Sequence, residues 1–338
     1  MISYLVNGIV ADISSPQKTT DYLSGKGEYM NPWIIALIVF TAIFVITNIG
    51  VYIFAWRNAK LTIEPRCISI EREIEYNKRK GLWLDFDSYD KQDYEIKGKD
   101  GYVLHATFID NGEVRGTGKY MILVHGHTSN RYGTVKYVNS YIKLGFSCLI
   151  YDSRSHGENA HDICTLGNLE SEDLMFVIED LRKRHSDIKV LGLHGESMGS
   201  STALSVVRFN PQIDFIVADC GFISTKQVIK DGYSRIHLAF LIYSVWFAAK
   251  VIYKIDMNKT SALKSLENNK YPILFIHGAG DTFIRPYHSE KLREQAAKNG
   301  AYTELILVDG AGHAKSRKVA GFEKYTGYIQ NFLNHIGI

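Results

Sequence analysis

The chain has 338 residues, of which 46% are hydrophobic, enough for one large domain with a substantial core or for two small ones. Its formal net charge is +3 and it holds no dense run of lysine and arginine with interleaved aromatic residues, so nucleic acid is not an expected partner. A charged fraction of 22% and an aromatic fraction of 12% exclude a disordered chain.

The cysteines carry no metal or redox motif. Cys67, Cys148, Cys164 and Cys220 form no Cys-x-x-Cys pair. We expect them to be small buried apolar residues, because a free cysteine packs well in a core. Their number alone leaves one disulfide open as an alternative.

The first predicted element is a helix over residues 32–56 that crosses a membrane once. Residues 33–56 contain no charged residue, and they exceed the roughly 20 residues that a spanning helix needs. Trp33, Tyr52 and Trp56 lie near the ends, where aromatic rings suit the headgroup zone. A buried core helix is the alternative. A cleaved signal peptide fits poorly, because the apolar stretch is too long and no Ala-x-Ala site follows it.

The charges on either side of this segment predict its orientation. Lys18 and Lys26 precede it, whereas Arg57, Lys60, Arg66, Arg72, Lys78, Arg79 and Lys80 follow it. By the positive-inside rule this bias favours a cytoplasmic C-terminal domain. Residues 1–31 form an N-terminal segment without a motif, and residues 57–95 are predicted to be a linker and the entry to the domain.

Residues 96–338 predict one α/β domain. Apolar runs predict strands at 102–109, 120–124, 147–151, 190–193, 215–218, 273–276 and 303–308. Helical patterns lie between most of them, at 132–144, 169–185, 198–209, 286–299 and 319–335. Near-continuous apolar strands that alternate with helices are typical of a mostly parallel sheet covered on both faces.

One stretch between the strands at 215–218 and 273–276 breaks this alternation. Residues 235–255 are strongly apolar and predict one helix or two short ones. We expect a small helical cap over an active-site cleft, at about residues 222–268. A second membrane span and an ordinary packing helix are the alternatives, although basic residues within or beside the stretch argue against a span.

The central motif is Gly195-Glu196-Ser197-Met198-Gly199, a Gly-x-Ser-x-Gly pentapeptide between a predicted strand and a predicted helix. A serine on such a tight turn projects clear of the sheet, and the helix N-terminus supplies free N–H groups beside it. We therefore assign Ser197 as a nucleophile. A plain strand-to-helix turn is the alternative.

A serine hydroxyl needs a base, and the base needs an orienting carboxylate. In this type of fold the acid follows the serine in the chain and the histidine comes last. Asp281 and His313 each lie in a loop just past an apolar strand, where a parallel sheet gathers its site residues. We assign Asp281 as the orienting acid and His313 as the base. Asp219, also at a strand end, is the second candidate acid.

Acyl transfer also needs N–H donors for the developing oxyanion. The N–H of Met198 is the first candidate, and the second should come from the loop after an early strand. Residues 121–130 read MILVHGHTSN, with a His-Gly pair directly after the strand, so we expect the N–H of His127 to be the second donor. The sequence has no His-Glu-x-x-His and no glycine-rich phosphate loop, so we expect no metal and no cofactor.

The motifs HGH, DSRSHG, HGESMGSS, ADCGF, HGAGD and GAGH follow one another from about residue 96 to the C-terminus. In these motifs the chain resembles the α/β-hydrolase superfamily. Within it, the chain is most similar to bacterial prolyl-oligopeptidase-type hydrolases with an N-terminal membrane anchor, related to the mammalian abhydrolase-domain proteins. The resemblance implies an α/β-hydrolase fold with an eight-stranded, mostly parallel sheet and an acyl-enzyme mechanism.

The sequence departs from that family pattern at two places. Asn159 stands where the Asp-x-Arg-x-His-Gly-x-Ser pattern has serine, with little expected effect. No propeller domain precedes the catalytic part in this sequence, so we do not expect oligopeptide cleavage selected by size.

Three functions remain open from the sequence. The first is a membrane-anchored carboxylic ester hydrolase acting on small acyl esters or lipid-like substrates, suggested by the predicted span and by apolar residues 235–255. The second is a peptidase, amidase or thioesterase that uses the same three residues. The third is a membrane-anchored interaction protein whose hydrolase fold is idle.

Overall fold

A computed structural model describes residues 30–235, 241–256, 258–259 and 261–338 of the chain. It divides into two compact units, Met1–Ile53 and Phe54–Ile338. The strands are β1 (Asp90–Lys97), β2 (Val103–Asp110), β3 (Lys119–Val124), β4 (Ser147–Tyr151), β5 (Val190–Glu196), β6 (Phe215–Asp219), β7 (Ile273–Gly278) and β8 (Thr303–Val308). The α-helices are α3 (Pro32–Ile63), α4 (Ile70–Arg79), α5 (Val135–Lys143), α6 (Leu169–Arg184), α7 (Met198–Ser205), α8 (Thr225–Arg235), α9 (Ile242–Ile252), α10 (Ala262–Ser265), α11 (Tyr287–Ala297), α12 (Ser316–Ala320) and α13 (Phe322–His335). Short 3-10 turns lie at Phe86–Ser88, Lys99–Gly101, Arg131–Thr134 and Val206–Phe209.

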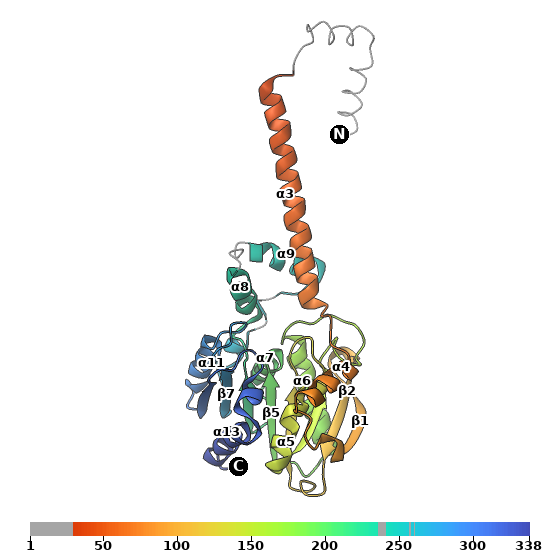
Figure 1. The fold of residues 1–338 in the computed structure, drawn as a ribbon, viewed down its shortest axis with the longest axis vertical. Helices are drawn as coiled ribbons and strands as arrows, with labels where there is room; N and C mark the ends of the chain where they lie inside the picture. Colours follow the sequence, from red (N-terminus) through yellow and green to blue (C-terminus); the bar gives the residue numbers. More distant parts are fainter. Residues whose placement is uncertain (1–29, 236–240, 257, 260) are drawn as a thin grey trace. The chain divides into compact units, whose positions relative to one another are not determined.

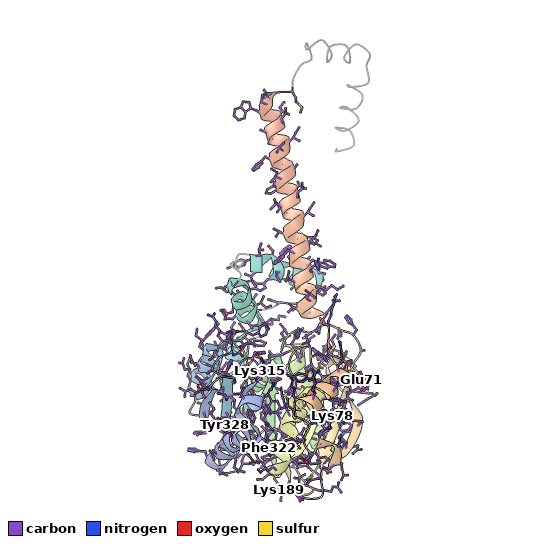
Figure 2. All side chains as sticks on the ribbon, in the orientation of Figure 1. Glu71, Lys78, Lys189, Lys315, Phe322 and Tyr328 are labelled. Carbon is purple, nitrogen blue, oxygen red and sulfur yellow. The ribbon has the colours of Figure 1, made fainter. Side chains whose placement is uncertain are left out.

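The long helix α3 is apolar and lacks charge over its first six turns. Among the described residues it is the one helix that is long and apolar enough to cross a membrane. Side chains 33–50 are exposed and project from the helix all along this length (Figure 2). The helix ends at Ile63 rather than at the predicted residue 56, because its last turns pack on α9 through Ala55 and Ala59.

The eight strands of the second unit form one sheet in the order β1-β2-β4-β3-β5-β6-β7-β8 (Figure 1). β2 pairs antiparallel with both β1 and β4, and every pair from β4 onward is parallel. Parallel neighbours need crossover connections, which the helices between the strands supply. The carboxyl ends of β3, β5, β6, β7 and β8 therefore meet at one edge of the sheet.

Helices cover both faces of the sheet because its central strands are apolar on both sides. On β3, Ile122 and Val124 point into one core, which packs against α6, α7, α10 and α11. Met121 and Leu123 alternate with them and point into the second core, which packs against α5 and α13. The predicted fold class, a mostly parallel eight-stranded sheet with helices on both faces, is confirmed.

Strand β1 was not among the strands that the apolar pattern predicts. Its sequence DKQDYEIK is polar, and Ile96 is the one residue of the strand that is fully buried. β1 is an edge strand, and charged side chains are common there because they discourage pairing with another chain. The sheet consequently begins at Asp90, before the predicted domain start at residue 96.

The connection between β6 and β7 carries α8, α9 and α10, where the sequence predicts a cap at about residues 222–268. α9 has 11 residues, fewer than a membrane span needs. It buries Val245, Ala248 and Ala249 and exposes Tyr243 and Phe247. The described part of the apolar stretch at residues 235–255 thus contains a short helix with one packed face and one open apolar face. Arg235 ends α8, and residues 236–240 lie outside the described residues.

Candidate active site

The nucleophile candidate lies on a strained turn between β5 and α7. Ser197 has φ of 55° and ψ of −114°, a conformation that L residues seldom adopt. A Cβ at Gly199 would lie 2.0 Å from the carbonyl oxygen of Val124, and one at Gly195 would lie 2.2 Å from the carbonyl oxygen of Gly199. Glycine is therefore required on both sides of the serine, where helix and strands approach closely.

A hydrogen-bonded chain links Ser197 to two loops at the carboxyl edge of the sheet. His313, in the loop after β8, has its Nε2 3.0 Å from Ser197 Oγ. Its Nδ1 lies 2.7 Å from Asp281 Oδ2, in the loop after β7. A carboxylate only accepts, so His313 carries its proton on Nδ1 and presents the Nε2 lone pair to the serine hydroxyl. The structure thus brings together the three residues that the sequence assigned to catalysis.

The Asp281 carboxylate is buried yet held in its ionised form. Burial alone would raise the pKa of Asp281, but hydrogen bonds from His277 and His313 outweigh it and lower the pKa well below its usual range. Its second oxygen accepts from the backbone N–H groups of Phe283 and Ile284 at 2.8 and 2.9 Å. A carboxylate fixed in this way orients the imidazole and stabilises its cationic form.

Asp219, the second candidate acid, faces elsewhere. Its carboxylate accepts from Ser316 Oγ at 3.0 Å and from Tyr325 Oη at 2.8 Å. Burial raises the pKa of Asp219 to about 6. Its contribution to the site is through the backbone, because the Asp219 carbonyl accepts from the N–H of Ser197 at 2.9 Å.

The two N–H groups expected to hold an oxyanion lie beside the serine. His127, Ser197 and Met198 line one cavity. Among the described residues, neither the N–H of His127 nor that of Met198 has a hydrogen-bond acceptor. The imidazole of His127 is turned away from this task, since its Nε2 lies 3.1 Å from the carbonyl oxygen of Thr62 and must donate to it.

Neutral histidines and ion pairs hold the loop of residues 125–130 after β3, which we call the oxyanion loop. Burial lowers the pKa of His156 to about 3, so its Nε2 accepts from the N–H of Thr128, which has φ of 68°. Arg131 pairs with Asp152 across the same loop. Asn159 donates to the carbonyl of Asp152 at 2.7 Å and accepts from the N–H of His105 at 2.9 Å. The Asp-x-Arg-x-His-Gly loop is thus a brace, and asparagine in place of serine closes it onto β2.

The cavity beside Ser197 has a volume of about 400 Å³, within the usual range for small-molecule sites. Its lining is mostly apolar and comes from α8, the last turns of α3, and the loops after β3, β4, β5, β6 and β7. Phe283 borders it with its ring 5.0 Å from the His313 ring in an edge-on arrangement. The arrangement offers a nucleophile, a base and two N–H donors to a substrate with an apolar part.

Two groups of potential metal ligands occur among the described residues. One comprises His127, His156 and Cys164, and the other Cys220, Asp281 and His313, with donor atoms within 4.8 Å of one another. In both groups the histidine nitrogens already form hydrogen bonds. Those of His127 and His156 brace the oxyanion loop, and His313 binds Asp281. Burial raises the pKa of Cys164 and of Cys220 well above the usual range, so both thiols stay protonated. All four cysteines are free.

Comparison with known proteins gives the same type of fold. The chain is 27% identical over 264 residues to the uncharacterized protein YqkD of Bacillus subtilis, covering 75% of this chain and 83% of that protein. It is 23% identical over 181 residues to the uncharacterized membrane protein YNL320W of Saccharomyces cerevisiae, covering 50% of this chain and 59% of that protein. The solved structure of the Pyrococcus furiosus esterase Pf2001 superposes with a TM-score of 0.61 at 26% identity, covering 75% of this chain and 96% of the esterase.

The family model described as the prolyl oligopeptidase family matches residues 138–336, more than half of the chain. The chain belongs to this family. Membership and the likeness to an esterase make it a serine hydrolase of the α/β-hydrolase type. The prolyl oligopeptidase family match begins within α5 and includes the loops that carry Ser197, Asp281 and His313.

The sequence missed the part of the site that α3 supplies. Phe54, Asn58, Leu61 and Thr62 line the cavity, although they fall at the end of the predicted span and in the predicted linker. A signal was present: Arg57, Asn58, Lys60 and Thr62 bring charged and polar residues close together in the last turns, and Ala55 and Ala59 recur four residues apart beside them. That pattern marks helix turns packed on protein rather than on lipid.

Proposed function

We propose that the protein hydrolyses carboxylic esters through an acyl-enzyme, with Ser197 as nucleophile, His313 as base and Asp281 as its orienting acid. The observation that carries the proposal is the chain of hydrogen bonds at 3.0 Å and 2.7 Å through His313, beside two N–H groups without an acceptor among the described residues. This is the arrangement that activates a serine hydroxyl and receives an oxyanion.

In the first half-reaction Ser197 Oγ attacks the ester carbonyl carbon while its proton passes to His313 Nε2. The carbonyl oxygen becomes an oxyanion held by the N–H groups of Met198 and His127. The bond from carbon to the alcohol oxygen then breaks, His313 returns the proton to that oxygen, and the alcohol leaves. Ser197 now carries the acyl group as an ester.

In the second half-reaction a water molecule attacks the acyl carbon and gives a proton to His313. The bond to Ser197 Oγ breaks, the serine recovers its proton from His313, and the carboxylic acid leaves. The sum is one ester and one water converted to one acid and one alcohol, without a cofactor.

The ester class is favoured over the peptide class by the apolar lining of the cavity and by the likeness to the Pf2001 esterase. Peptide or amide cleavage by the same residues is the second candidate, because the family bears the name of a peptidase. The apolar cavity also motivates lipid-like acyl esters as substrates.

Membrane attachment through α3 is part of the proposal. Its support is the length and apolar character of the helix and the naming of the yeast relative as a membrane protein. The excess of basic residues after the helix favours a cytoplasmic position for the catalytic unit.

Two measurements on the full-length chain in nanodiscs test the proposed function. One is labelling by a fluorophosphonate, and the other is turnover of nitrophenyl butyrate. We expect Ser197→Ala to abolish labelling and to lower kcat by about 10⁶-fold. Ser205→Ala on the same helix α7 is the matched control: this buried hydroxyl has no partner among the described residues, and its removal should keep the label.

Other outcomes separate the alternatives. A wild-type chain that labels and cleaves a peptide nitroanilide but no ester would transfer the assignment to peptidase. A folded wild-type chain that neither labels nor turns over any ester or amide would favour an idle fold.

A further inference from the structure

One wall of the cavity is made by the last turns of α3. Phe54, Asn58 and Thr62 recur every four residues, so they lie on one face of the helix, with Leu61 beside them. All four line the cavity that Ser197 also lines. We call these four residues the α3 wall.

Hydrogen bonds tie the end of α3 to the oxyanion loop and to the loop after β4. The carbonyl of Thr62 accepts from the His127 ring at 3.1 Å, and the carbonyl of Ile63 accepts from the N–H of Cys164 at 2.7 Å. Just beyond the helix, the N–H of Ile68 donates to the carbonyl of Thr128 at 2.8 Å. The wall therefore keeps a set distance from the atoms that would hold the oxyanion.

A neighbouring stripe of the same helix packs against the cap. Ala55, Ala59 and Ile63 are at most 2% exposed and form a core with Val245 and Ala249 of α9. Alanine at two successive turns lets the two helices approach closely. The α3 wall is thus supported from behind by a packed helix pair.

The α3 wall is partly apolar, and its two polar side chains each donate a hydrogen bond to their own helix. Asn58 Nδ2 donates to the carbonyl of Phe54 at 2.7 Å, and Thr62 Oγ1 donates to the carbonyl of Asn58 at 3.0 Å. One N–H of Asn58 and the hydroxyl of Thr62 are thus engaged by their own helix, and the other two residues of the wall, Phe54 and Leu61, are apolar. Val228 and Ile229 of α8 line the same cavity. An alkyl chain needs no polar partner, whereas a peptide brings N–H and C=O groups that do.

We propose that the α3 wall, with Val228 and Ile229, forms the subsite for the acyl chain, and that the substrate is an ester of an unbranched acyl chain of medium length or longer. This rests on the proposed ester hydrolysis. The acyl carbon stays bonded to Ser197 Oγ when the alcohol leaves, so the chain that lies along the α3 wall remains there until water releases the acid.

The test compares two asparagines of one helix in the full-length chain in nanodiscs. Asn58 and Asn48 each donate to the carbonyl four residues earlier at 2.7 Å, but Asn58 lines the cavity and Asn48 is exposed. Asn58→Phe fills the cavity beside the wall. We expect it to lower the ratio of kcat/KM for the nitrophenyl octanoate to that for the acetate by at least about ten-fold. Asn48→Phe should leave the ratio unchanged.

A second substrate series and a second variant serve as controls for where the chain binds and for misfolding of the first variant. Hexyl and octyl acetates carry the chain on the alcohol side and should show little gain over ethyl acetate. Asn58→Ala widens the cavity and should move the preference toward longer acyl chains, which keeps the test available where Asn58→Phe does not fold. Fluorophosphonate labelling reports that each variant is folded.

The results distinguish this subsite from the proposed function. An unchanged chain-length ratio in both Asn58 variants, with ester turnover intact, would overturn the subsite alone. A preference that appears in the alcohol series and not in the acyl series would do the same. Absence of turnover on every ester by a labelled wild-type chain would overturn both.

Discussion

Two sides of the active-site cavity are built in different ways. The catalytic side, with Ser197, Asp281 and His313, comes from loops at the carboxyl edge of the sheet, and hydrogen bonds link these three side chains to one another. The other side, the α3 wall, is one helix face on which the side chains of Asn58 and Thr62 each donate to a carbonyl of the same helix. The contrast teaches that chemistry and chain selection rest on separate structural elements, so a substitution on one side should spare the other.

The largest expected effect is a loss of kcat, and it distinguishes the two candidate acids. Asp281→Asn should lower kcat by about 10⁴-fold, because an amide no longer holds the tautomer of His313 that accepts the serine proton. Asp219→Asn should keep kcat within about ten-fold, because its carboxylate faces Ser316 and Tyr325 rather than His313. Steady-state hydrolysis of nitrophenyl butyrate measures both. Equal losses in the two variants would contradict the assignment of the acid.

A smaller effect concerns how stability depends on pH. Asp219 has a pKa of about 6 in the folded chain, against about 3.9 in an unfolded one. Between these values the folded chain keeps a proton that the unfolded chain has lost, so this contribution to stability is present at low pH and is lost as pH rises through about 6. It amounts to at most about 3 kcal/mol.

Urea unfolding of the wild type and of Asp219→Asn from pH 4 to pH 7 measures this contribution. The free-energy difference between the two proteins should shrink as pH rises, by the amount given above. Asp281, whose pKa is lowered, contributes with the opposite sign and only below about pH 4, so Asp281→Asn should show a constant difference over the same range. A difference independent of pH for Asp219→Asn would disprove the raised pKa.

The smallest effect concerns the support of the α3 wall. Ala59 is fully buried against α9, so Ala59→Leu should overpack the contact and cost about 1–3 kcal/mol of unfolding free energy. Ala42→Leu on the exposed part of the same helix is the control and should cost nothing measurable. Thermal unfolding in nanodiscs compares them. A loss at Ala42 equal to that at Ala59 would mean that α3 does not pack on the cap through this stripe.

The sequence predicted the central sheet well because its strands are buried on both faces and therefore almost wholly apolar. It did not predict β1, since an edge strand with polar side chains has the pattern of a linker. The predicted span ends at residue 56, whereas α3 continues to Ile63. Composition does not show where the packed turns begin, because lipid and a protein surface both accept Ala55 and Ala59.

For the site, the order of motifs along the chain was enough to bring Ser197, Asp281 and His313 onto one short list. It assigned Asp281 as the acid and kept Asp219 as the second candidate, because both follow a strand of the same parallel sheet. The choice depends on side-chain direction, which the loop after β7 fixes through the N–H groups of Phe283 and Ile284. The α3 wall lies far from the motifs in sequence, and no local pattern ties Asn58 to Ser197.

α3 runs without interruption from Pro32 to Ile63, and its last turns belong to the second compact unit, which begins at Phe54. Proteolytic shedding would therefore have two different products. A cut before Phe54 frees a catalytic fragment whose cavity is complete, whereas a cut within residues 54–63 frees one with an open side. The two cuts lie only a few residues apart on one helix. Which of them is made would decide whether the freed fragment keeps its choice of substrate.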